Sequence, residues 1–200
     1  MSENAQDQDL AGRRIVLGVT GGIAAYKSCT LCRLLKAAGA QVQVVMTAAA
    51  QQFVSAATFA ALSGQAVGTD MFSHPERIPH LATMAGANLM VIAPATANTL
   101  ARLRAGLADD LLSACALGAN CPIVVAPAMN SAMYHHPATQ ENLKVLISRG
   151  VLCIPPGTGS LACGGEGQGR MAEPEEIFNF IVALFKGQLP ALGYQSAEML

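Results

Sequence analysis

Charge is the first thing this sequence has little of. Only 12% of its 200 residues are Asp, Glu, Lys or Arg, which is about half of the roughly 25% found in a typical soluble domain. The 12 basic and 13 acidic residues nearly balance, giving a net charge of -1, and Lys and Arg form no block. We therefore expect no nucleic acid and no membrane surface as partner, since both attract clustered positive charge.

Long apolar runs are absent too. Gly, Pro, Asn and charged residues interrupt every apolar stretch before it reaches the ~20 residues that a membrane-spanning helix needs. A hydrophobic content of 52% nevertheless excludes a disordered chain. We expect one globular domain, and because its charges are too few to cover it, we expect partner subunits to bury part of its surface.

A secretory signal is also missing, because residues 1–9 are polar and acidic with no basic and apolar segments. We therefore expect a cytoplasmic protein whose cysteines are reduced. Cys29 and Cys32 form a C-x-x-C pair in a predicted helix, but no second pair completes a tetrahedral metal site. Neither a metal nor a disulfide is expected there. Like these two, three other cysteines lie among apolar residues, where thiols pack as small hydrophobic groups: Cys115, Cys121 and Cys153.

What the sequence does contain is an alternation of strands and helices. Short apolar runs predict buried parallel strands at 14–19, 41–46, 89–93, 122–126 and 151–154. Helical spacing predicts helices at 24–38, 55–62, 99–118, 138–149 and 173–186, the third of them with an optional break at Gly106. The fold class predicted is α/β: a doubly wound, Rossmann-like (flavodoxin-like) parallel sheet with helices on both faces.

Ligands of such sheets bind outside the carboxyl ends of the strands. There, Gly21 and Gly22 precede a helix, whose free N–H groups can hold an anion, although a tight turn would also explain them. They form neither a Walker A loop nor a G-x-G-x-x-G fingerprint. Thr96, Asn98 and Thr99 make a second polar helix start, which capping explains in part. Two such starts at one sheet edge favour one phosphate-bearing ligand.

Four motifs in order along the chain carry a resemblance to a known family. The segment IPHL at 78–81 resembles the family's active-site histidine segment. PATANT at 94–99 resembles its PASANT motif, with a threonine in place of the serine. PAMN at 127–130 resembles the start of its PxMNxxMW motif, with Tyr134 where the family often has Trp. The glycine-rich segment 159–171 resembles its substrate-recognition flap, with the flap cysteine at Cys163.

On these motifs, residues 13–186 resemble the homo-oligomeric flavin-containing cysteine decarboxylases, and most of all the phosphopantothenoylcysteine decarboxylase domain of coenzyme A biosynthesis. The resemblance implies FMN as cofactor and a homotrimer, or a higher assembly of trimers, with FMN near a subunit interface. The implied FMN-binding residues come from the strand-end loops: Thr20, Gly21, Gly22, Ile23, Thr47, Phe53, Thr96, Ala97, Asn98, Thr99, Ala128 and Met129.

The implied reaction is the decarboxylation of (R)-4'-phospho-N-pantothenoylcysteine to 4'-phosphopantetheine. An N-acylated cysteine cannot form a Schiff base, so loss of CO2 needs a different electron sink. Moving a hydride from Cβ to FMN gives a thioaldehyde, whose C=S lies β to the carboxylate. CO2 then leaves, and the resulting enethiol is reduced. The catalytic and substrate-binding residues implied are His80, Met129, Asn130, Ala162, Cys163 and Arg170.

Each of these residues has an implied role and a plainer explanation. Asn130 would orient the carboxylate through uncharged N–H donors, or would simply cap a helix. His80 would exchange a proton near neutral pH, or would be structural. Cys163 would donate a proton in the reductive half of the reaction, or would be an exposed loop thiol. Arg170 would pair with the substrate phosphate or carboxylate, or would brace the flap.

The predicted organisation is a disordered N-terminus at 1–12, an FMN-binding decarboxylase domain at 13–186 with a flexible flap at 155–171, and a tail or linker at 187–200. Bacterial members often continue into a CTP-dependent ligase, so a free-standing enzyme and the first part of a bifunctional protein both stay open. Other functions implied by the same fold are a peptidyl-cysteine decarboxylase, a flavin prenyltransferase and a non-catalytic regulatory subunit. The last two do not need Asn130 and Cys163 together.

Overall fold

A computed structural model of the chain describes residues 8–72, 78–160 and 166–188. Its centre is a five-stranded parallel sheet in the order β2-β1-β3-β4-β5, which confirms the predicted doubly wound fold. This is the flavodoxin-like order, in which the chain reverses its direction of winding between β1 and β3. The strands are β1 (Arg14–Val19), β2 (Gln41–Met46), β3 (Leu89–Ala95), β4 (Ile123–Pro127) and β5 (Leu152–Cys153).

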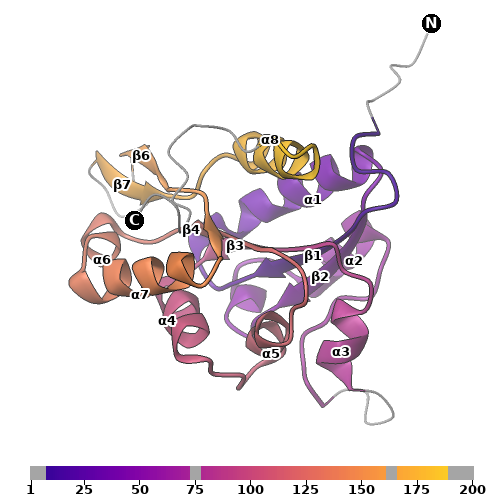
Figure 1. Ribbon diagram of the computed structural model, residues 1–200, viewed down its shortest axis with the longest axis horizontal. Coiled ribbons are helices and arrows are strands. Elements are labelled where there is room, and N and C mark those ends of the chain that lie inside the picture. The colour runs from indigo at the N-terminus through magenta and orange to yellow at the C-terminus, as the bar shows by residue number, and fades with distance from the viewer. Residues whose placement is uncertain (1–7, 73–77, 161–165, 189–200) are drawn as a thin grey trace, which may run out of the picture.

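Helices cover both faces of this sheet (Figure 1). On one face lie α1 (Lys27–Ala37), α2 (Ala56–Ser63) and α8 (Pro174–Phe185). On the other face lie α4 (Ala97–Ala105), α5 (Leu111–Leu117) and α7 (Pro137–Ser148), while α3 (Pro79–Met84) packs against α5. Three short helices complete this part of the chain: η1 (Ile23–Tyr26), η2 (Ala50–Gln52) and α6 (Ser131–Tyr134).

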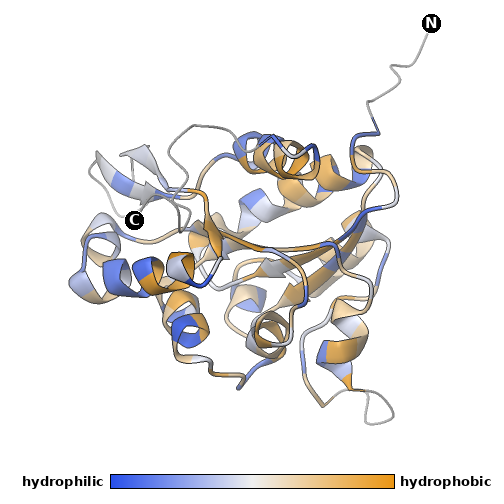
Figure 2. Cartoon of the chain, in the orientation of Figure 1, coloured by the Kyte–Doolittle hydropathy of each residue, from blue (hydrophilic) through white to orange (hydrophobic). Residues whose placement is uncertain are grey.

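Strand periodicity divides the apolar residues into two cores. In β1, Ile15 and Leu17 pack on the side of α1 and α8, while Val16 packs on the side of α5. Figure 2 shows the apolar colour on the sheet and on the helix surfaces that face it. Because both faces of every strand are covered, the strands read as nearly continuous apolar runs, and this is what made them predictable.

Local signals explain several helix ends. The side chain of Ser55 accepts a hydrogen bond from the Ala57 N–H and begins α2. At Gly106 the backbone adopts φ 71°, a left-handed conformation that glycine adopts without strain. This glycine divides the predicted helix 99–118 into α4 and α5, so the optional break is confirmed.

The structure corrects two of the predicted boundaries. Strand β3 does not end at Ala93 but runs through Pro94 to Ala95, which pairs with Pro127 of β4. Residues 8–12 are not disordered, because Leu10 is buried and its N–H donates to the Ala38 carbonyl at 2.9 Å. Residues 1–7 and 189–200, also predicted to be loose, lie outside the described residues.

A small antiparallel hairpin was not predicted. Strands β6 (Gly157–Ser160) and β7 (Glu166–Arg170) pair within the segment expected to be a flexible flap. Few apolar side chains mark these glycine-rich strands, so the sequence has no strand-like alternation there. The hairpin lies beside α6, at the end of the molecule where the strands β3 and β4 terminate (Figure 1).

Candidate functional site

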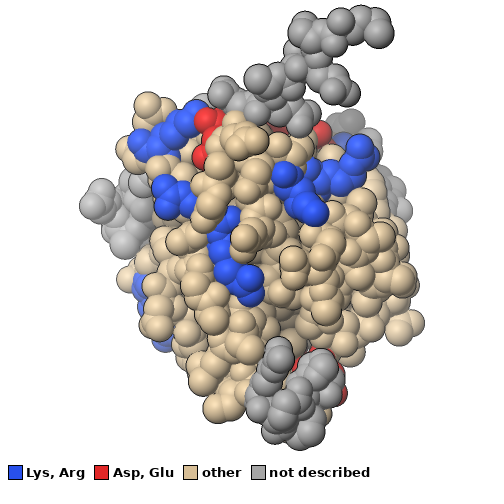
Figure 3. Space-filling view, turned by 90° about the vertical axis from the view of Figure 1, so that its right-hand side faces the viewer, with Lys and Arg blue, Asp and Glu red and all other residues tan. Residues whose placement is uncertain are grey.

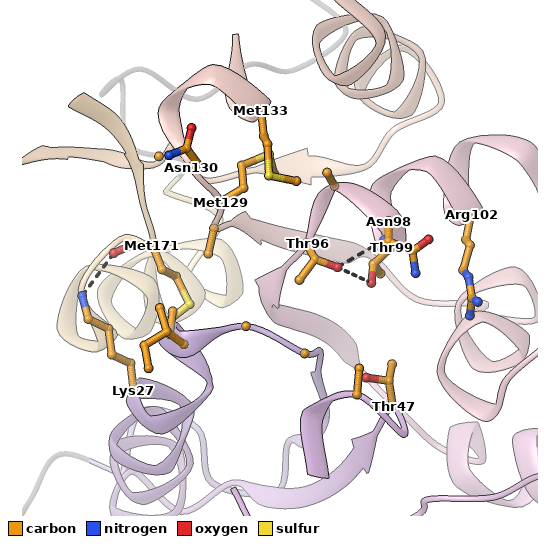
Figure 4. A pocket seen from close by; sticks show the side chains of 18 of the residues that line it. Lys27, Thr47, Thr96, Asn98, Thr99, Arg102, Met129, Asn130, Met133 and Met171 are labelled. Atoms are coloured by element: carbon orange, nitrogen blue, oxygen red, sulfur yellow. Dashed lines mark hydrogen bonds between the residues drawn. The ribbon is translucent and has the colours of Figure 1, made fainter. Parts of the chain in front are cut away.

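A cavity of about 1050 Å³ lies at the carboxyl ends of β1, β3 and β4. It sits beside the β1/β3 position where the strand order reverses, which is where ligands bind in sheets of this kind. Its walls come from the loops after β1, β2, β3 and β4 and from β7, and Figure 4 shows these side chains around one space. Its volume is at the upper end of the range for small-molecule sites, roughly 300–1000 Å³.

The loop after β1 depends on a glycine. A Cβ at Gly21 would lie 2.4 Å from the Ala49 Cβ and 2.8 Å from the Ala49 carbonyl carbon. No larger residue fits there unless the loop after β2 moves. At Gly22 a Cβ would meet only the Thr96 Cγ2, at 3.7 Å. Because Gly22 has no side chain, its backbone is accessible from the cavity.

Hydrogen bonds of side-chain hydroxyl groups connect the strand ends beneath the cavity. The buried Thr20 hydroxyl donates to the Pro94 carbonyl at 2.6 Å and accepts from the Thr96 N–H at 3.2 Å. The Ser28 hydroxyl on α1 donates to the Ala93 carbonyl at 2.6 Å. These bonds fix the end of β3 relative to β1, and with it the start of α4.

Helix α4 begins in the cavity wall. Thr96 is its N-cap, with Oγ1 accepting from the Thr99 N–H at 3.3 Å and lying 3.0 Å from the Thr99 Oγ1. Asn98 is exposed at the same end of the helix. The capping explanation of Thr96 is thus correct. It is compatible with anion binding, because the helix N-terminus and its free N–H groups still face the cavity.

At the far end of α4, Arg102 lies between two acidic residues. Its guanidinium forms ion pairs with Asp110 at 2.7 Å and with Asp109 at 3.3 Å, and all three side chains line the cavity. Asp110 is also the N-cap of α5, with its carboxylate accepting from the Ser113 N–H at 2.7 Å. This end of the cavity is therefore polar and carries three charged side chains.

The loop after β4 combines a cap with apolar side chains. Asn130 is the N-cap of α6, its Oδ1 accepting from the Ala132 N–H at 2.8 Å. This hydrogen bond fixes the orientation of the Asn130 side chain in the wall of the cavity. Met129 and Met133 lie together near Asn130, and Met171 lines the cavity beside Lys27 (Figure 4). Their polarisable thioethers suit contact with an aromatic ring.

Strand β7 packs directly on this loop. The Met129 N–H donates to the Gly169 carbonyl at 2.9 Å, and a Cβ at Gly169 would lie 2.3 Å from the Met129 carbonyl oxygen. Arg170, next in the strand, forms an ion pair with Glu173 at 2.9 Å. Glu173 is also 2.8 Å from Lys27, and the hydrogen bond from Lys27, with the charges of both cations, lowers the pKa of the Glu173 carboxyl.

Most of the predicted FMN residues line this one cavity: Gly21, Gly22, Ile23, Thr47, Thr96, Ala97, Asn98, Thr99, Ala128 and Met129. Asn130 and Arg170 line it too. Thr20 does not, because it is buried beneath the loops and acts through its hydrogen bonds. Phe53 is half exposed and is not among the residues that line the cavity, so its contact with FMN stays a prediction.

His80 is not in the cavity wall either. It lies on α3, where its carbonyl faces the Cys115 Sγ on α5 at 3.9 Å. Ala162 and Cys163 lie outside the described residues. The structure therefore unites the glycine, PATANT and PAMN loops but leaves the histidine segment apart.

Several residues of the cavity were missed by sequence reasoning. Lys27 follows a glycine pair that forms no Walker A loop, and Arg102, Asp109 and Asp110 lie in no recognisable motif. Met133 and Met171 look like ordinary apolar residues in sequence. Helical spacing could have found Arg102, because it lies one turn beyond Asn98 on the same helix.

The five cysteines of the described segments are free thiols. Burial raises the pKa of the Cys32 thiol to about 11 and those of Cys115 and Cys153 to about 12. Burial also raises the pKa of the Cys29 thiol. Among the described residues, no group of three or more His, Cys, Asp or Glu side chains could hold a metal ion, and no helix is long and apolar enough to cross a membrane.

Comparison with known proteins gives consistent matches. A protein-family model described as Flavoprotein matches residues 3–186. The Coenzyme A biosynthesis bifunctional protein CoaBC of Haemophilus influenzae is 48% identical over 178 residues, covering 88% of this chain and 44% of that protein. CoaBC of Bacillus subtilis is 48% identical over 170 residues, covering 84% and 42%. The chain thus spans less than half the length of these relatives.

Two solved structures are similar along almost their whole length. A mutant PPC decarboxylase complexed with pantothenoylaminoethenethiol has a TM-score of 0.78 and 30% identity, covering 87% of this chain and 98% of that one. SpaF, described as an FMN-dependent cysteine decarboxylase, has a TM-score of 0.77 and 32% identity, covering 88% and 99%.

Proposed function

The chain belongs to the Flavoprotein family, and from that premise we propose that it catalyses the FMN-dependent decarboxylation of (R)-4'-phospho-N-pantothenoylcysteine to 4'-phosphopantetheine, a step of coenzyme A biosynthesis. One observation carries the proposal: a single cavity unites the PATANT helix start with the Met129-Asn130 loop. The first suits a phosphate-bearing cofactor and the second a substrate carboxylate. The similarity to CoaBC proteins and to a PPC decarboxylase structure supports the choice of substrate.

The residues present fit FMN. The start of α4 and the open backbone at Gly22 would receive its phosphate, since both offer N–H groups without side-chain obstruction. Asn98 and Thr47 would bind the ribityl hydroxyls. Met129 and the exposed Ile23 would pack on the ring. When bound, FMN supplies a reversible hydride acceptor, which an N-acylated cysteine needs in order to lose CO2.

Asn130 is suited to the reacting end of the substrate. Its amide is oriented by the hydrogen bond that caps α6, so the side chain loses little further conformational entropy when the substrate binds. An uncharged donor can hold a carboxylate without retaining it once CO2 forms. Met129 beside it would contact the same part of the substrate, and Ala162 in the flap remains a proposed substrate contact.

Two proton-handling roles are proposed with it. Cys163 would donate the proton to carbon when the enethiol is reduced, and the neighbouring PPC decarboxylase structure, a mutant complexed with pantothenoylaminoethenethiol, is in line with an enethiol as intermediate. His80 would exchange a proton at the substrate. Because His80 lies outside the cavity of its own chain, we propose that it serves the cavity of a neighbouring copy.

An oligomer is proposed on independent grounds. Large apolar side chains are exposed on and near α3, including Phe72, Ile78 and Leu81, at 79%, 56% and 53%. Figure 3 shows a face on which Lys and Arg occupy the upper part while the lower part carries almost none. A homotrimer or an assembly of trimers would bury such surface and bring α3 of one copy to another copy's cavity.

The test is a CO2-release assay on the purified, FMN-loaded protein. Phosphopantothenoylcysteine should give CO2 and 4'-phosphopantetheine, while a peptide ending in cysteine and dimethylallyl phosphate with reduced FMN should give no product. Release from the peptide alone would make the protein a peptidyl-cysteine decarboxylase. A prenylated flavin would make it a prenyltransferase. If FMN is bound but no substrate reacts, the result would favour a regulatory role and contradict the proposal.

A further inference from the structure

Helix α6, which is capped by Asn130, is only one turn long. Within it the Tyr134 N–H donates to the Asn130 carbonyl at 2.9 Å, and the His135 N–H donates to the Ser131 carbonyl at 3.0 Å. A single turn is not stable by itself in water, because ordering the backbone costs more than so few hydrogen bonds return. Contacts with the rest of the chain must therefore hold α6, and with it the side chain of Asn130.

Side chains bond to both ends of this turn. At its start the Asn130 Oδ1 accepts from the Ala132 N–H at 2.8 Å. At its end the Gln140 Nε2 donates to the Tyr134 carbonyl at 2.5 Å. The last carbonyls of a helix have no partner within the helix, so Gln140 supplies a donor that the turn itself cannot.

Gln140 lies on α7, which is fixed in its own right. His136 is the N-cap of this helix, with Nδ1 accepting from the Ala138 N–H at 3.2 Å, and Pro137 occupies the first turn. The Gln140 N–H donates to the His136 carbonyl at 3.1 Å. Apolar side chains of α7 are buried in the same core as Tyr134: Leu143, Leu146 and Ile147. The donor therefore stands on a 12-residue helix anchored in the core, whereas its acceptor belongs to a 4-residue helix.

Gln140 is separate from the cavity. Asn130 lines the cavity wall, but Gln140 and Tyr134 do not. The helices α6 and α7 lie next to each other at the end of the molecule that carries the hairpin (Figure 1). Gln140 can therefore affect a ligand only indirectly, through the way it holds α6.

From these contacts we propose that Gln140 is a positioning residue for the decarboxylation, acting through α6 on the Asn130 side chain. This role rests on the proposed function. Without the donor at Tyr134 the turn would fray from its last residue, and the Ala132 N–H would no longer stay in line with the Asn130 Oδ1. The amide would then adopt several orientations, and the substrate carboxylate would meet a correctly oriented donor for only part of the time.

Gln140→Met provides the first test, because methionine has a similar length and helix propensity but no donor. We expect kcat for CO2 release to fall about tenfold with FMN still bound, since a misplacement of order 1 Å costs up to about 10²-fold. Gln140→Lys keeps a donor at similar reach and should restore most of the wild-type kcat. The matched control is Lys144→Met, one turn further along α7, where the side chain is exposed; it should leave kcat unchanged.

A double-mutant cycle separates a positioning role from a general loss of stability. Serine caps a helix as asparagine does but lacks the amide N–H donors, so Asn130→Ser should keep α6 and lower kcat. Adding Gln140→Met to Asn130→Ser should lower kcat no further, because Gln140 acts through the amide that is already missing. If the two effects multiply instead, Gln140 does not act through Asn130 and the proposal is wrong.

Hydrogen exchange of the FMN-loaded protein is a third measurement, and it needs no turnover. The Tyr134 and His135 amides should exchange about tenfold faster in Gln140→Met than in the wild type, with no change in Lys144→Met. Wild-type exchange in α6, or a wild-type kcat, in Gln140→Met would overturn the positioning role. If the wild-type protein releases no CO2, the proposed function fails, and exchange in α6 alone then decides whether Gln140 holds the turn.

Discussion

The cavity has two walls that are built in different ways. One wall consists of the loops after β1, β2 and β3, in which short backbone segments contact one another directly, as Gly21 contacts Ala49. The other consists of the loop after β4 and strand β7, joined by Gly169 and by the ion pairs of Lys27, Glu173 and Arg170.

This difference suits two ligands with different needs. A cofactor that stays bound is served by a wall that the sheet itself holds in place, with Thr20 linking β1 to β3. A substrate that must enter and leave is served by a wall attached through a few contacts at the base of a hairpin. Perturbing one wall should therefore affect FMN retention, and perturbing the other should affect turnover.

The largest effect is expected from Asn130→Asp. A carboxylate caps a helix as well as an amide does, so α6 should persist, but a second negative charge would repel the substrate carboxylate. We expect CO2 release to fall by at least about 10²-fold, the size of effect seen when one oriented donor is lost, with FMN still bound. Asn142→Asp, on α7, is the control and should retain activity. Full activity of Asn130→Asp would remove Asn130 from the substrate site.

Two glycine variants compare the walls directly. Gly21→Ala places a Cβ 2.4 Å from the Ala49 Cβ, and Gly169→Ala places one 2.3 Å from the Met129 carbonyl oxygen. Each should cost roughly 1–3 kcal/mol in unfolding free energy through forced displacement. Gly21→Ala should lose FMN on gel filtration, whereas Gly169→Ala should keep FMN and lose turnover. Gly118→Ala, outside the cavity, controls for added volume. Equal FMN loss in both variants would contradict the division into two walls.

A smaller effect is expected from Thr20→Val. This change keeps the shape but leaves the Pro94 carbonyl and the Thr96 N–H without their buried partner. We expect a loss of about 1–3 kcal/mol in chemical denaturation, together with weaker FMN binding. Thr20→Ser should restore both properties. A normal FMN affinity in Thr20→Val would show that α4 is positioned without this bond.

The smallest effect concerns pH. The pKa of Glu173 is lowered from its ordinary value of 4.5 by Lys27 and Arg170. Its contribution to stability is therefore complete above that value and lost as pH falls through the lower, folded-state pKa. The difference in melting temperature between wild type and Glu173→Gln should shrink as pH falls from about 6 to about 3. A difference that stays constant over this range would contradict the ion-pair origin.

The first wall and the PAMN loop of the second wall could be predicted from sequence, but the strand β7 and its ion pairs could not. Gly21, Gly22 and the PATANT segment follow apolar strands, so the parallel-sheet rule alone placed them at one edge. Lys27 and Arg170 both form ion pairs with Glu173, which lies about 146 residues from Lys27 along the chain. No local sequence pattern predicts such a contact. The strand β7 is glycine-rich and lacks alternation, so its pairing depends on packing against Met129.

The resemblance to a known family identified site residues that sequence periodicity does not indicate. It named Asn130, which the structure places in the cavity, and Phe53, which the structure places outside it. Its histidine, His80, lies on α3 beside α5, a location that local sequence patterns do not indicate.

The domain also closes on itself at the end away from the cavity. Asp9 and Lys186 form an ion pair at 2.8 Å, and Arg13 stacks over the Phe185 ring at 4.8 Å. Both chain ends of the folded unit therefore meet at the amino edge of the sheet, while ligands enter at the carboxyl edge. The end of α8 therefore lies on the opposite side of the sheet from the cavity, so the contacts that close the amino edge are separated from the ligand site by the full length of the strands.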